Sequence, residues 1–518
     1  MTVTMIRKIA FTIAITGTCI AANAQNIGDA LRYSQQEPGG SARAQAIGGA
    51  LGSLGGEYSS MFVNPAGVAF FKTSEAAVTF GFRNSDVKSN YLGSSGSDNK
   101  GRLFINSGAL IFGGNKVSYG LGINRTANYN QNVYYQGVNN KSSYSDNYII
   151  QLSKEKILPS YLESQQQQQN GEFRHGPQEA YFTYLLNPQV DGAGNPNGLW
   201  ESIVPVDNGI RQENTISTRG GSDELSFALG GNFSDKFYLG GSLNTPIIKY
   251  ESVRSFRETN INQPGSPLNY FEAKENLRTE GFGFNAKIGA IFKPVAPLRL
   301  GVNVQTPSWI SFTDTYTTTI TTSTTTKGVQ IASSTEFANG VADESKYNIT
   351  TPWKGGASAT YIFGNPTGDP SKPTGFLTAD YEFVNYSSMK MRIRNGGSDD
   401  KPQSDTRNQA IKNTYTTASN FRVGAELKLN VFAIRAGFAN YGNPFKEKSL
   451  GSSRNYYSGG LGYRNKGVFV DLAVTFSNND RLDQPYIVES NPQNIQSPAP
   501  ATLKVNNTSA ALTVGFKF

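Results

Sequence analysis

The sequence contains almost no cysteine or histidine, and this restricts the chemistry that the chain can perform. Cys19 and His175 are the only residues of their types among 518. Thiol nucleophiles, cysteine metal sites and disulfides are therefore excluded beyond the first 19 residues. His175 stands beside Gly176-Pro177 in a polar stretch, without a Gly-x-Ser-x-Gly motif. We expect a solvated loop residue there, and no catalytic site.

Long apolar runs are also missing. Only 37% of the residues are apolar, the mean hydropathy is −0.41, and no apolar run of helix-spanning length follows the N-terminus, which excludes a transmembrane helix. Acidic residues are scattered, so we expect no metal site and no cofactor. Asp399-Asp400 could bind Ca²⁺ or lipopolysaccharide-bridging cations, but simple solvation is the preferred interpretation.

The first 24 residues have the features of a secretory signal peptide. Arg7 and Lys8 precede an apolar stretch at 9–20, and Ala22-Asn23-Ala24 forms a small-x-small cleavage site. We predict cleavage before Gln25. A lipoprotein signal at Cys19 is the disfavoured alternative. Removing the two basic residues lowers the formal net charge from +8 to +6, and no basic cluster with interleaved aromatics indicates nucleic-acid binding.

Apolar and polar residues alternate strictly in many segments. In "SAALTVGFKF", residues 510, 512, 514, 516 and 518 are apolar, and the odd positions include Thr513, Gly515 and Lys517. Elsewhere the polar face carries charge, at Arg422, Glu426, Lys428, Arg435 and Asp471. Such charges cannot face a dry core between two sheets, but they can face a polar lumen. The pattern predicts a transmembrane antiparallel β-barrel, all-β, with its apolar face toward lipid.

The number of such segments gives a consistency test. We predict strands near 75–83, 103–113, 116–137, 211–233, 236–259, 270–293, 296–325, 345–364, 373–394, 412–430, 431–441, 454–465, 467–477 and 501–518. The count of about fourteen is even, as in bacterial single-chain barrels. Connections after even-numbered strands are mostly tight turns. Those after odd-numbered strands are long: 84–102, 138–210, 260–269, 326–344, 395–411, 442–453 and 478–500. This alternation places both termini in the periplasm and the long loops outside the cell.

The largest predicted extracellular loop, 138–210, contains apolar residues at helical spacing. Tyr148, Ile149, Leu152 and Leu158 could form one face of a short helix that stops near Pro159, and Tyr181, Tyr184 and Leu185 a second. Such helices could offer an apolar groove, or they could simply pack on the barrel rim. Both interpretations remain open.

Residues 25–72 precede the first strand and are rich in glycine. The segment ends in the turn Asn64-Pro65-Ala66-Gly67. A fourteen-strand barrel is wide enough to leave a bore, and a compact glycine-rich segment could fill it. We therefore expect a plug over 25–72 within a barrel over 73–518. A disordered periplasmic leader is the alternative.

The stretch "GSARAQAIGGALGSLGGEYSSMFVNPAGVAFF", with the strand pattern and the terminal Phe518, resembles the FadL/TodX-like family, the long-chain fatty acid and hydrophobic compound transporters of outer membranes. The family's Asn-Pro-Ala motif matches Asn64, Pro65 and Ala66. "QTPSWISF", "DYEFVNYSSMKMRI" and "FRVGAELKLNVFAIRAGFANYGNPF" add to the resemblance, which spans nearly the whole mature chain. Only one acid, Glu57, precedes Ser59, where the family often has more.

The resemblance implies a mechanism. An N-terminal hatch, here including Asn64, Pro65, Ala66 and Gly67, would plug the lumen, and hydrophobic cargo would leave sideways through a gap beside a kinked third strand. Gly120 and Gly122 in "SYGLGINRTANYNQ" could permit that kink. They could equally make room for an obstruction in the lumen, which is the interpretation we prefer.

The resemblance and the strand pattern together predict a passive, non-enzymatic transporter in the outer membrane of a Gram-negative bacterium. A general porin or a structural or adhesive barrel is the alternative. The expected partners are a hydrophobic small molecule such as a fatty acid or hydrocarbon, membrane lipid and lipopolysaccharide, and the barrel-assembly machinery through Phe518, with no nucleic acid and a monomeric state. Active import is disfavoured, since such barrels have about 22 strands.

Overall fold

The structure is a computed structural model that describes residues 27–168, 173–261, 264–364, 373–488, 491 and 495–518. The predicted signal peptide, 1–24, lies outside the described residues. No described helix is long and apolar enough to cross a bilayer.

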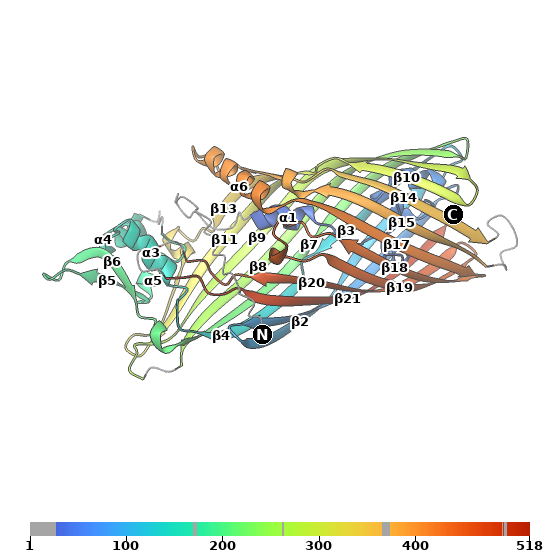
Figure 1. Ribbon diagram of the computed structural model, residues 1–518. Helices are drawn as coiled ribbons and strands as arrows, with labels where there is room; N and C mark the ends of the chain where they lie inside the picture. Colours follow the sequence, from blue (N-terminus) through green and yellow to red (C-terminus); the bar gives the residue numbers. More distant parts are fainter. Residues whose placement is uncertain (1–26, 169–172, 262–263, 365–372, 489–490, 492–494) are drawn as a thin grey trace, which may run out of the picture.

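Nineteen strand segments form one antiparallel sheet that closes on itself, because β1 pairs with β2 on one side and with β21 on the other (Figure 1). The segments are β1 (Glu75–Tyr91), β2 (Ser94–Phe112), β3 (Val117–Asn128), β4 (Gln131–Asn139), β7 (Ile210–Phe233), β8 (Phe237–Asn260), β9 (Leu268–Val295), β10 (Leu298–Gln305), β11 (Trp309–Thr324), β12 (Gly328–Ser333), β13 (Asp343–Thr350), β14 (Lys354–Gly364), β15 (Thr374–Asn385), β16 (Lys390–Ile393), β17 (Thr417–Leu429), β18 (Phe432–Tyr441), β19 (Arg454–Asn465), β20 (Val468–Asp483) and β21 (Ala501–Lys517).

The barrel has fourteen strands, as the sequence predicts. Four strands are interrupted and appear as the pairs β3/β4, β10/β11, β13/β14 and β15/β16. β12 is an additional short strand that forms a hairpin with residues 319–324 of β11. Pro307 and Pro352 stand in two of the interruptions, and proline cannot donate to a strand ladder. The sequence predicted each of these pairs as one continuous strand.

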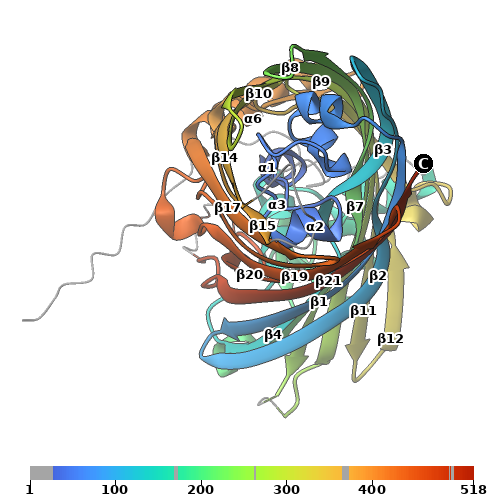
Figure 2. The ribbon, with the colours of Figure 1, turned by 90° about the vertical axis from the view of Figure 1, so that its right-hand side faces the viewer.

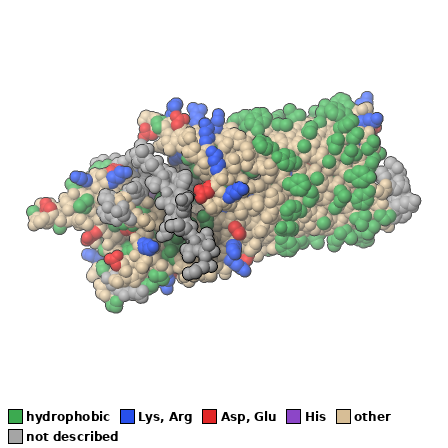
Figure 3. Space-filling model, viewed as in Figure 1, with side chains coloured by type: hydrophobic (Ala, Val, Ile, Leu, Met, Phe, Trp, Pro, Cys, Tyr) green, Lys and Arg blue, Asp and Glu red, His purple; other side chains and the backbone are tan. Residues whose placement is uncertain are grey.

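The two faces of the wall have the predicted chemistry. Along β21, Leu512, Val514 and Phe516 are exposed on the outside, whereas Thr513 is buried on the inside. Arg422, Glu426, Arg435 and Asp471 are likewise buried on the inner face. Figure 3 shows apolar side chains gathered over one half of the barrel and charged side chains mainly over the other. The apolar half is the part of the wall suited to a bilayer.

The strands are connected differently at the two ends. At the turn end, near the C-terminus, short connections at 113–116, 234–236, 296–297, 430–431 and 466–467 join the strands. The opposite, loop end carries most of the long connections, as expected. The predicted loop 84–102 is wrong, because β1 and β2 continue to Tyr91 and Ser94 and join through Leu92-Gly93. The strands extend past the apolar band, where polar residues lie on both faces and apolar alternation no longer marks a strand.

A small outer domain covers the loop end (Figure 1). It comprises α3 (Asp146–Lys154), α4 (Pro159–Gln168), α5 (Pro177–Phe182), η3 (Val206–Asn208) and the hairpin β5 (Leu186–Val190) with β6 (Pro196–Ser202). Its core contains Leu152, Leu162, Phe173 and Trp200, and it packs on Phe271 and Ile320 of the wall. Both predicted helices are present, but the first ends at Lys154 and not near Pro159, which begins α4, and Tyr184 and Leu185 lie beyond the end of α5. Tyr148, Ile149, Leu152 and Tyr181 contact this core.

Four further short elements line the loop end: η4 (Ser334–Phe337), η5 (Tyr386–Ser388), α6 (Asp400–Thr414) and η6 (Lys448–Leu450). Ile411 of α6 packs on Met391 and Ile393 of β16 in an apolar cluster that also includes wall residues of β8, β11 and β13. The Asp400 carboxylate accepts a hydrogen bond from the Gly396 amide at 2.8 Å.

Candidate functional site

Residues 27–72 lie inside the ring of strands, shown in blue in Figure 2. They form the lumen segment, with α1 (Ile27–Ser34), α2 (Ala42–Ala46), η1 (Tyr58–Phe62) and η2 (Pro65–Phe70). Most of its residues are buried, and its helices contact strands from nearly the whole circumference. The segment predicted as either a plug or a free leader therefore lies inside the barrel and contacts its inner wall.

The Asn64-Pro65-Ala66-Gly67 turn connects η1 to η2 and lies against the wall. The Asn64 side-chain oxygen accepts a hydrogen bond from the Ala66 amide at 3.1 Å, which caps η2. Its side-chain nitrogen donates to the carbonyl of Gly52 at 2.6 Å and to those of Ala290 and Val302 at 3.3 Å. Asn64 is fully buried, so the turn joins two parts of the lumen segment to β9 and β10.

Glycines on the inner wall allow this close approach. At Gly289 an added Cβ would overlap the Asn64 side chain, and at Gly240 it would overlap Pro65 and Ala66. The same holds at five further glycines of the wall that touch the lumen segment. These wall glycines are Gly230, Gly240, Gly289, Gly301, Gly424, Gly437 and Gly460. Because these seven residues have no side chain, the lumen segment can pack directly against the backbone of the wall. We call these seven positions the glycine seat.

A buried network of charges also ties the lumen segment to the wall. Arg43 of α2 donates to Glu426 of β17 at 2.7 and 2.8 Å. Arg435 of β18 donates to Glu426 at 2.6 Å and to Asp471 of β20 at 2.7 Å. The Asp471 and Arg435 side chains are each only 1% exposed. The charged residues that alternate with apolar residues along these strands thus neutralise one another inside the barrel.

The backbone ladder of the wall is incomplete between β2 and β3, although the Arg102 and Lys100 side chains of β2 reach Asn130 and Ser217 across this stretch. Their ladder covers only Ser107–Phe112 on β2, and its last pair is Ser107 with Asn124. Beyond it, β3 shifts register at Arg125/Ala127 and ends at Asn128, while β4 remains paired with β7. Residues 94–106 of β2 are therefore paired with β1 alone among the described strands. Leu103 and Ile105 stand exposed on the outer face of this unpaired edge.

Residues 37–40 of the lumen segment, here called the strap, bridge this gap from the inside. The Glu37 amide donates to the Thr126 carbonyl of β3 at 2.9 Å, and the Gly40 amide donates to the Asn124 side chain at 2.8 Å. Asn106 of β2 donates to the Gly40 carbonyl at 2.5 Å. The strap thus bonds to both strands where they no longer bond to each other.

The strap is also held by β1 and is shaped by its glycines. The Glu37 carboxylate forms an ion pair with Arg83 of β1 at 2.8 Å. A Cβ at Gly39 would overlap the Asn124 side chain and the Arg125 carbonyl, and Gly40 has a φ of +86°. Because glycine adopts such a φ without strain, the segment "EPGG" can turn sharply against the wall.

Gly120 and Gly122, predicted as a strand kink, lie instead in the regular part of β3. Gly120 pairs with Ile111 and Ala228, and Gly122 with Ala109 and Ser226, without a register shift. An added Cβ at Gly122 would lie 3.0 Å from the Phe62 ring of the lumen segment. These glycines accommodate the lumen segment, and the irregularity in β3 begins at Arg125.

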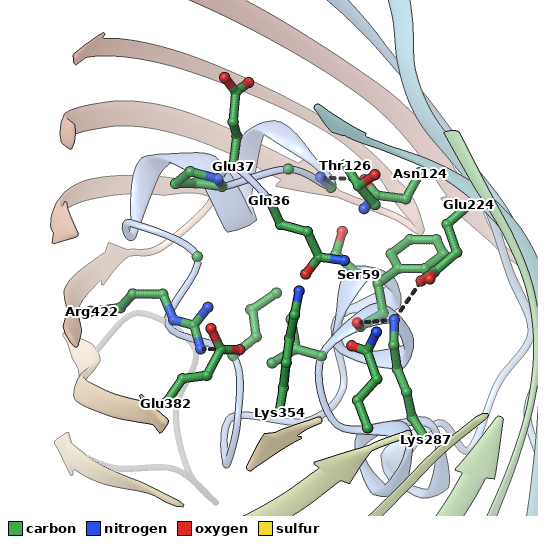
Figure 4. Close-up of a pocket in the computed structure, with 18 of the residues that line it drawn as sticks. Gln36, Glu37, Ser59, Asn124, Thr126, Glu224, Lys287, Lys354, Glu382 and Arg422 are labelled. Carbon is green, nitrogen blue, oxygen red and sulfur yellow. Dashed lines mark hydrogen bonds and ion pairs between the residues drawn. The ribbon is translucent and has the colours of Figure 1, made fainter. Parts of the chain in front are cut away.

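A pocket with a volume of about 60 Å³ lies between the strap and wall residues of β9, β10, β14, β15 and β17. Figure 4 shows three basic side chains in it: Lys287 beside Glu224, Arg422 beside Glu382, and Lys354 between these two pairs, directed toward Gln36. Asn124 and Thr126 of β3 also line it, so the cavity adjoins the incomplete part of the wall.

His175 lies in the outer domain, just before α5. Its ring contacts Asp343 and lies 3.1 Å from the Thr318 hydroxyl. The expectation of a solvated loop residue is wrong, because its side chain is only 14% exposed. Burial and the neighbouring Arg174 hold the pKa of His175 below its usual range. Thr318 is itself buried and donates to Glu179 at 2.9 Å, so its hydroxyl is engaged within the domain.

Glu179 of α5 is the other notable titratable group of the outer domain. It is fully buried, and burial raises its pKa to about 8, although hydrogen bonds from Thr318 and Gly176 oppose the shift. Within the described residues, no group of three or more His, Cys, Asp or Glu side chains is arranged to hold a metal ion.

Comparisons with solved structures find the same fold in other proteins. A FadL homologue of Pseudomonas aeruginosa aligns with a TM-score of 0.57 at 13% identity, over 94% of this chain and 100% of the other. The toluene transporter TodX of Pseudomonas putida aligns with a TM-score of 0.51 at 10% identity, over 93% and 99%. Neither a family model nor a curated protein matches the sequence. The chain therefore shares the fold of these two proteins over nearly its whole length.

Proposed function

We propose that the protein is a passive transporter of hydrophobic compounds, including long-chain fatty acids, in the outer membrane of a Gram-negative bacterium. The observation that carries the proposal is the strap. It lies between a cavity in the blocked lumen and the one described stretch of wall where β2 and β3 are unpaired. Two proteins of the same fold, a FadL homologue and a toluene transporter, support it by analogy.

The proposed route is lateral. Cargo enters from the loop end, passes beside the lumen segment and leaves between β2 and β3 into the membrane when the strap shifts. Such a path has a physical advantage, because each CH₂ group exposed to water costs about 0.8 kcal/mol. An exit into lipid spares the alkyl chain from the aqueous periplasm. The seat of wall glycines keeps the axial path closed while the side path operates.

Uptake of labelled toluene and labelled palmitate by cells that lack their own uptake proteins tests the proposal. Cells carrying the intact protein should accumulate both faster than cells without it, and the purified protein in planar bilayers should give no steady conductance of small ions. A large conductance in the intact protein, or no protein-dependent uptake of either compound, would favour a porin or a structural barrel instead.

A further inference from the structure

The outer face of the wall carries a row of basic side chains toward the loop end. Lys390 and Arg392 belong to β16, and Arg394 follows directly after it. All three are exposed, whereas Met391 and Ile393 between them are buried on the inner side. Residues two apart on one strand face the same side and lie about 7 Å from each other. The three cations therefore form a line on the outside of the barrel, here called the basic row.

The basic row has no carboxylate partner in the described part of the chain. Arg394 donates one hydrogen bond to the Asn348 side chain at 3.3 Å. Lys346 of β13 faces Arg394 across the ladder, since the Arg394 amide donates to the Lys346 carbonyl at 2.8 Å, and Lys346 pairs with Glu344 at 2.7 Å. Like charges at opposite positions of neighbouring strands are destabilising. The wall thus gathers four cations against one carboxylate here.

Neighbouring elements do not cancel this charge. The outward residues of β11, next to β13, are all neutral: Trp309, Ser311, Thr313 and Thr315. α6 lies along the other edge of β16, where the Asn408 side chain bonds to the strand backbone at 2.8 and 3.0 Å. With its N-cap, α6 contains equal numbers of acids and bases: Asp399, Asp400 and Asp405 against Lys401, Arg407 and Lys412. Figure 3 shows basic side chains gathered beside α6, between the apolar half and the loop end.

The basic row begins where the apolar band ends. Trp309 pairs with Thr350, which pairs in turn with Lys390, so the tryptophan and the lysine stand at the same register. Trp309 and Trp353 are exposed on the outside. Aromatic side chains of this kind collect at the boundary between hydrocarbon and water. A row that starts at this boundary and continues toward the loop end lies at the level of lipid head groups.

We propose that the basic row binds the phosphate groups of lipopolysaccharide. The loop end faces the outside of the cell in the predicted orientation, and lipopolysaccharide forms the outer leaflet there. Its lipid A anchor carries phosphates on a disaccharide above several acyl chains. The phosphates meet the row while the chains lie on the apolar band below. Arginine binds phosphate through two parallel hydrogen bonds, and lysine binds it as a point charge. The inference rests on the proposed outer-membrane location and does not depend on the cargo.

Binding of lipid A to the purified, folded protein in detergent tests this site. The probes are lipid A with both phosphates and the same lipid after dephosphorylation, and native mass spectrometry counts the bound molecules. Each basic side chain at an anionic lipid surface contributes about fivefold in affinity. Lys390→Gln/Arg392→Gln/Arg394→Gln should therefore weaken lipid A binding by about 100-fold. Binding of the dephosphorylated lipid should change by less than the effect of one such side chain.

The matched control is Lys116→Gln/Lys236→Gln/Lys466→Gln, which removes three exposed cations at the turn end and should bind lipid A like wild type. The heat-dependent band shift of folded barrels confirms equal folding. Equal lipid A binding by wild type and the basic-row variant, or equal binding of both probes by wild type, would overturn the site. Phosphatidylglycerol bound as tightly as lipid A would contradict the choice of lipopolysaccharide. Because no uptake is measured, failure here leaves the proposed transport function standing.

Discussion

Replacing Gly289 by leucine is expected to unseat the lumen segment and turn a closed barrel into a conducting pore. Any Cβ at this position overlaps the Asn64 side chain, which is fully buried and bonded to three carbonyl groups. The barrel itself should still form, because Gly289 lies in a regular ladder with Gly240 and Asn303. Overpacking typically costs about 1–3 kcal/mol, and moving the turn is the simplest way to relieve it.

Ion conductance in planar bilayers measures the effect, together with protease cleavage within 27–72. Wild type should show almost no conductance steps, and Gly289→Leu should show frequent open steps and faster cleavage. Gly241→Leu is the matched control on the neighbouring strand, since a Cβ there would meet only the Lys287 carbonyl at 3.8 Å. If the two variants are equally closed, the glycine seat is not what holds the segment.

Removing the Arg435 guanidinium should have the largest effect on stability. Arg435 is the only described partner within 3 Å of Asp471, since Arg464 lies 3.6 Å away. Its loss leaves a carboxylate that is 1% exposed with only Arg464, at 3.6 Å, as a counter-charge. Breaking a buried pair from one side typically costs about 3–5 kcal/mol. Arg435→Met should lower the free energy of unfolding by this amount in urea titrations of the protein in lipid vesicles.

The double variant Arg435→Met/Asp471→Asn separates charge from packing. Because both members of the pair are then neutral, it should recover a good part of the lost stability. Glu426 keeps its two hydrogen bonds from Arg43 in both variants. If the free energy of unfolding of Arg435→Met lies within about 1 kcal/mol of the wild-type value, water must enter the lumen and screen these charges.

Much of the barrel could be predicted because the bilayer imposes a simple rule on each strand. Residues such as Leu512 and Val514 must face lipid while Thr513 faces the lumen, and this alternation is readable without any long-range information. Only the outer part of the β1–β2 hairpin, residues 84–102, was missed, because this rule does not apply outside the bilayer. Above the apolar band both faces of a strand are polar, so residues 84–102 look like a loop although backbone pairing continues.

The lumen segment could be anticipated only in outline. Its glycine content indicated tight packing, and Asn64 was identified within the turn. The partners of that turn, such as Gly240 and Gly289, lie more than 170 residues away. A single glycine within a strand pattern does not indicate which distant segment will pack against it. Gly120 and Gly122 were expected either to permit a kink or to make room for an obstruction, the preferred interpretation, and the register shift of β3 falls at Arg125/Ala127.

Local sequence patterns indicate the position of the strap and the burial of Lys354 only weakly. "EPGG" reads as a turn, and only the fold places it against Asn106 and Asn124. "WKGGAS" reads as the exposed start of a strand, and the burial of its lysine depends on the lumen segment opposite. Both features arise from contacts between distant parts of the chain, which local patterns do not encode.

The central claim is that cargo leaves where the strap bridges β2 and β3, and a reversible crosslink tests it directly. In the double variant Gly39→Cys/Asn124→Cys the two positions are close, because a Cβ at Gly39 lies 2.9 Å from an Asn124 side-chain atom. Beyond Cys19 the chain has no other cysteine, so the introduced pair can only join the strap to β3. Palmitate uptake is measured in the oxidised state and again after reduction, beside both single variants.

The account predicts that oxidation blocks palmitate uptake, that reduction restores it, and that the single variants transport in both states. Equal uptake by the oxidised and reduced double variant, with the crosslink shown to be complete, would mean that the strap need not move and that cargo takes another path.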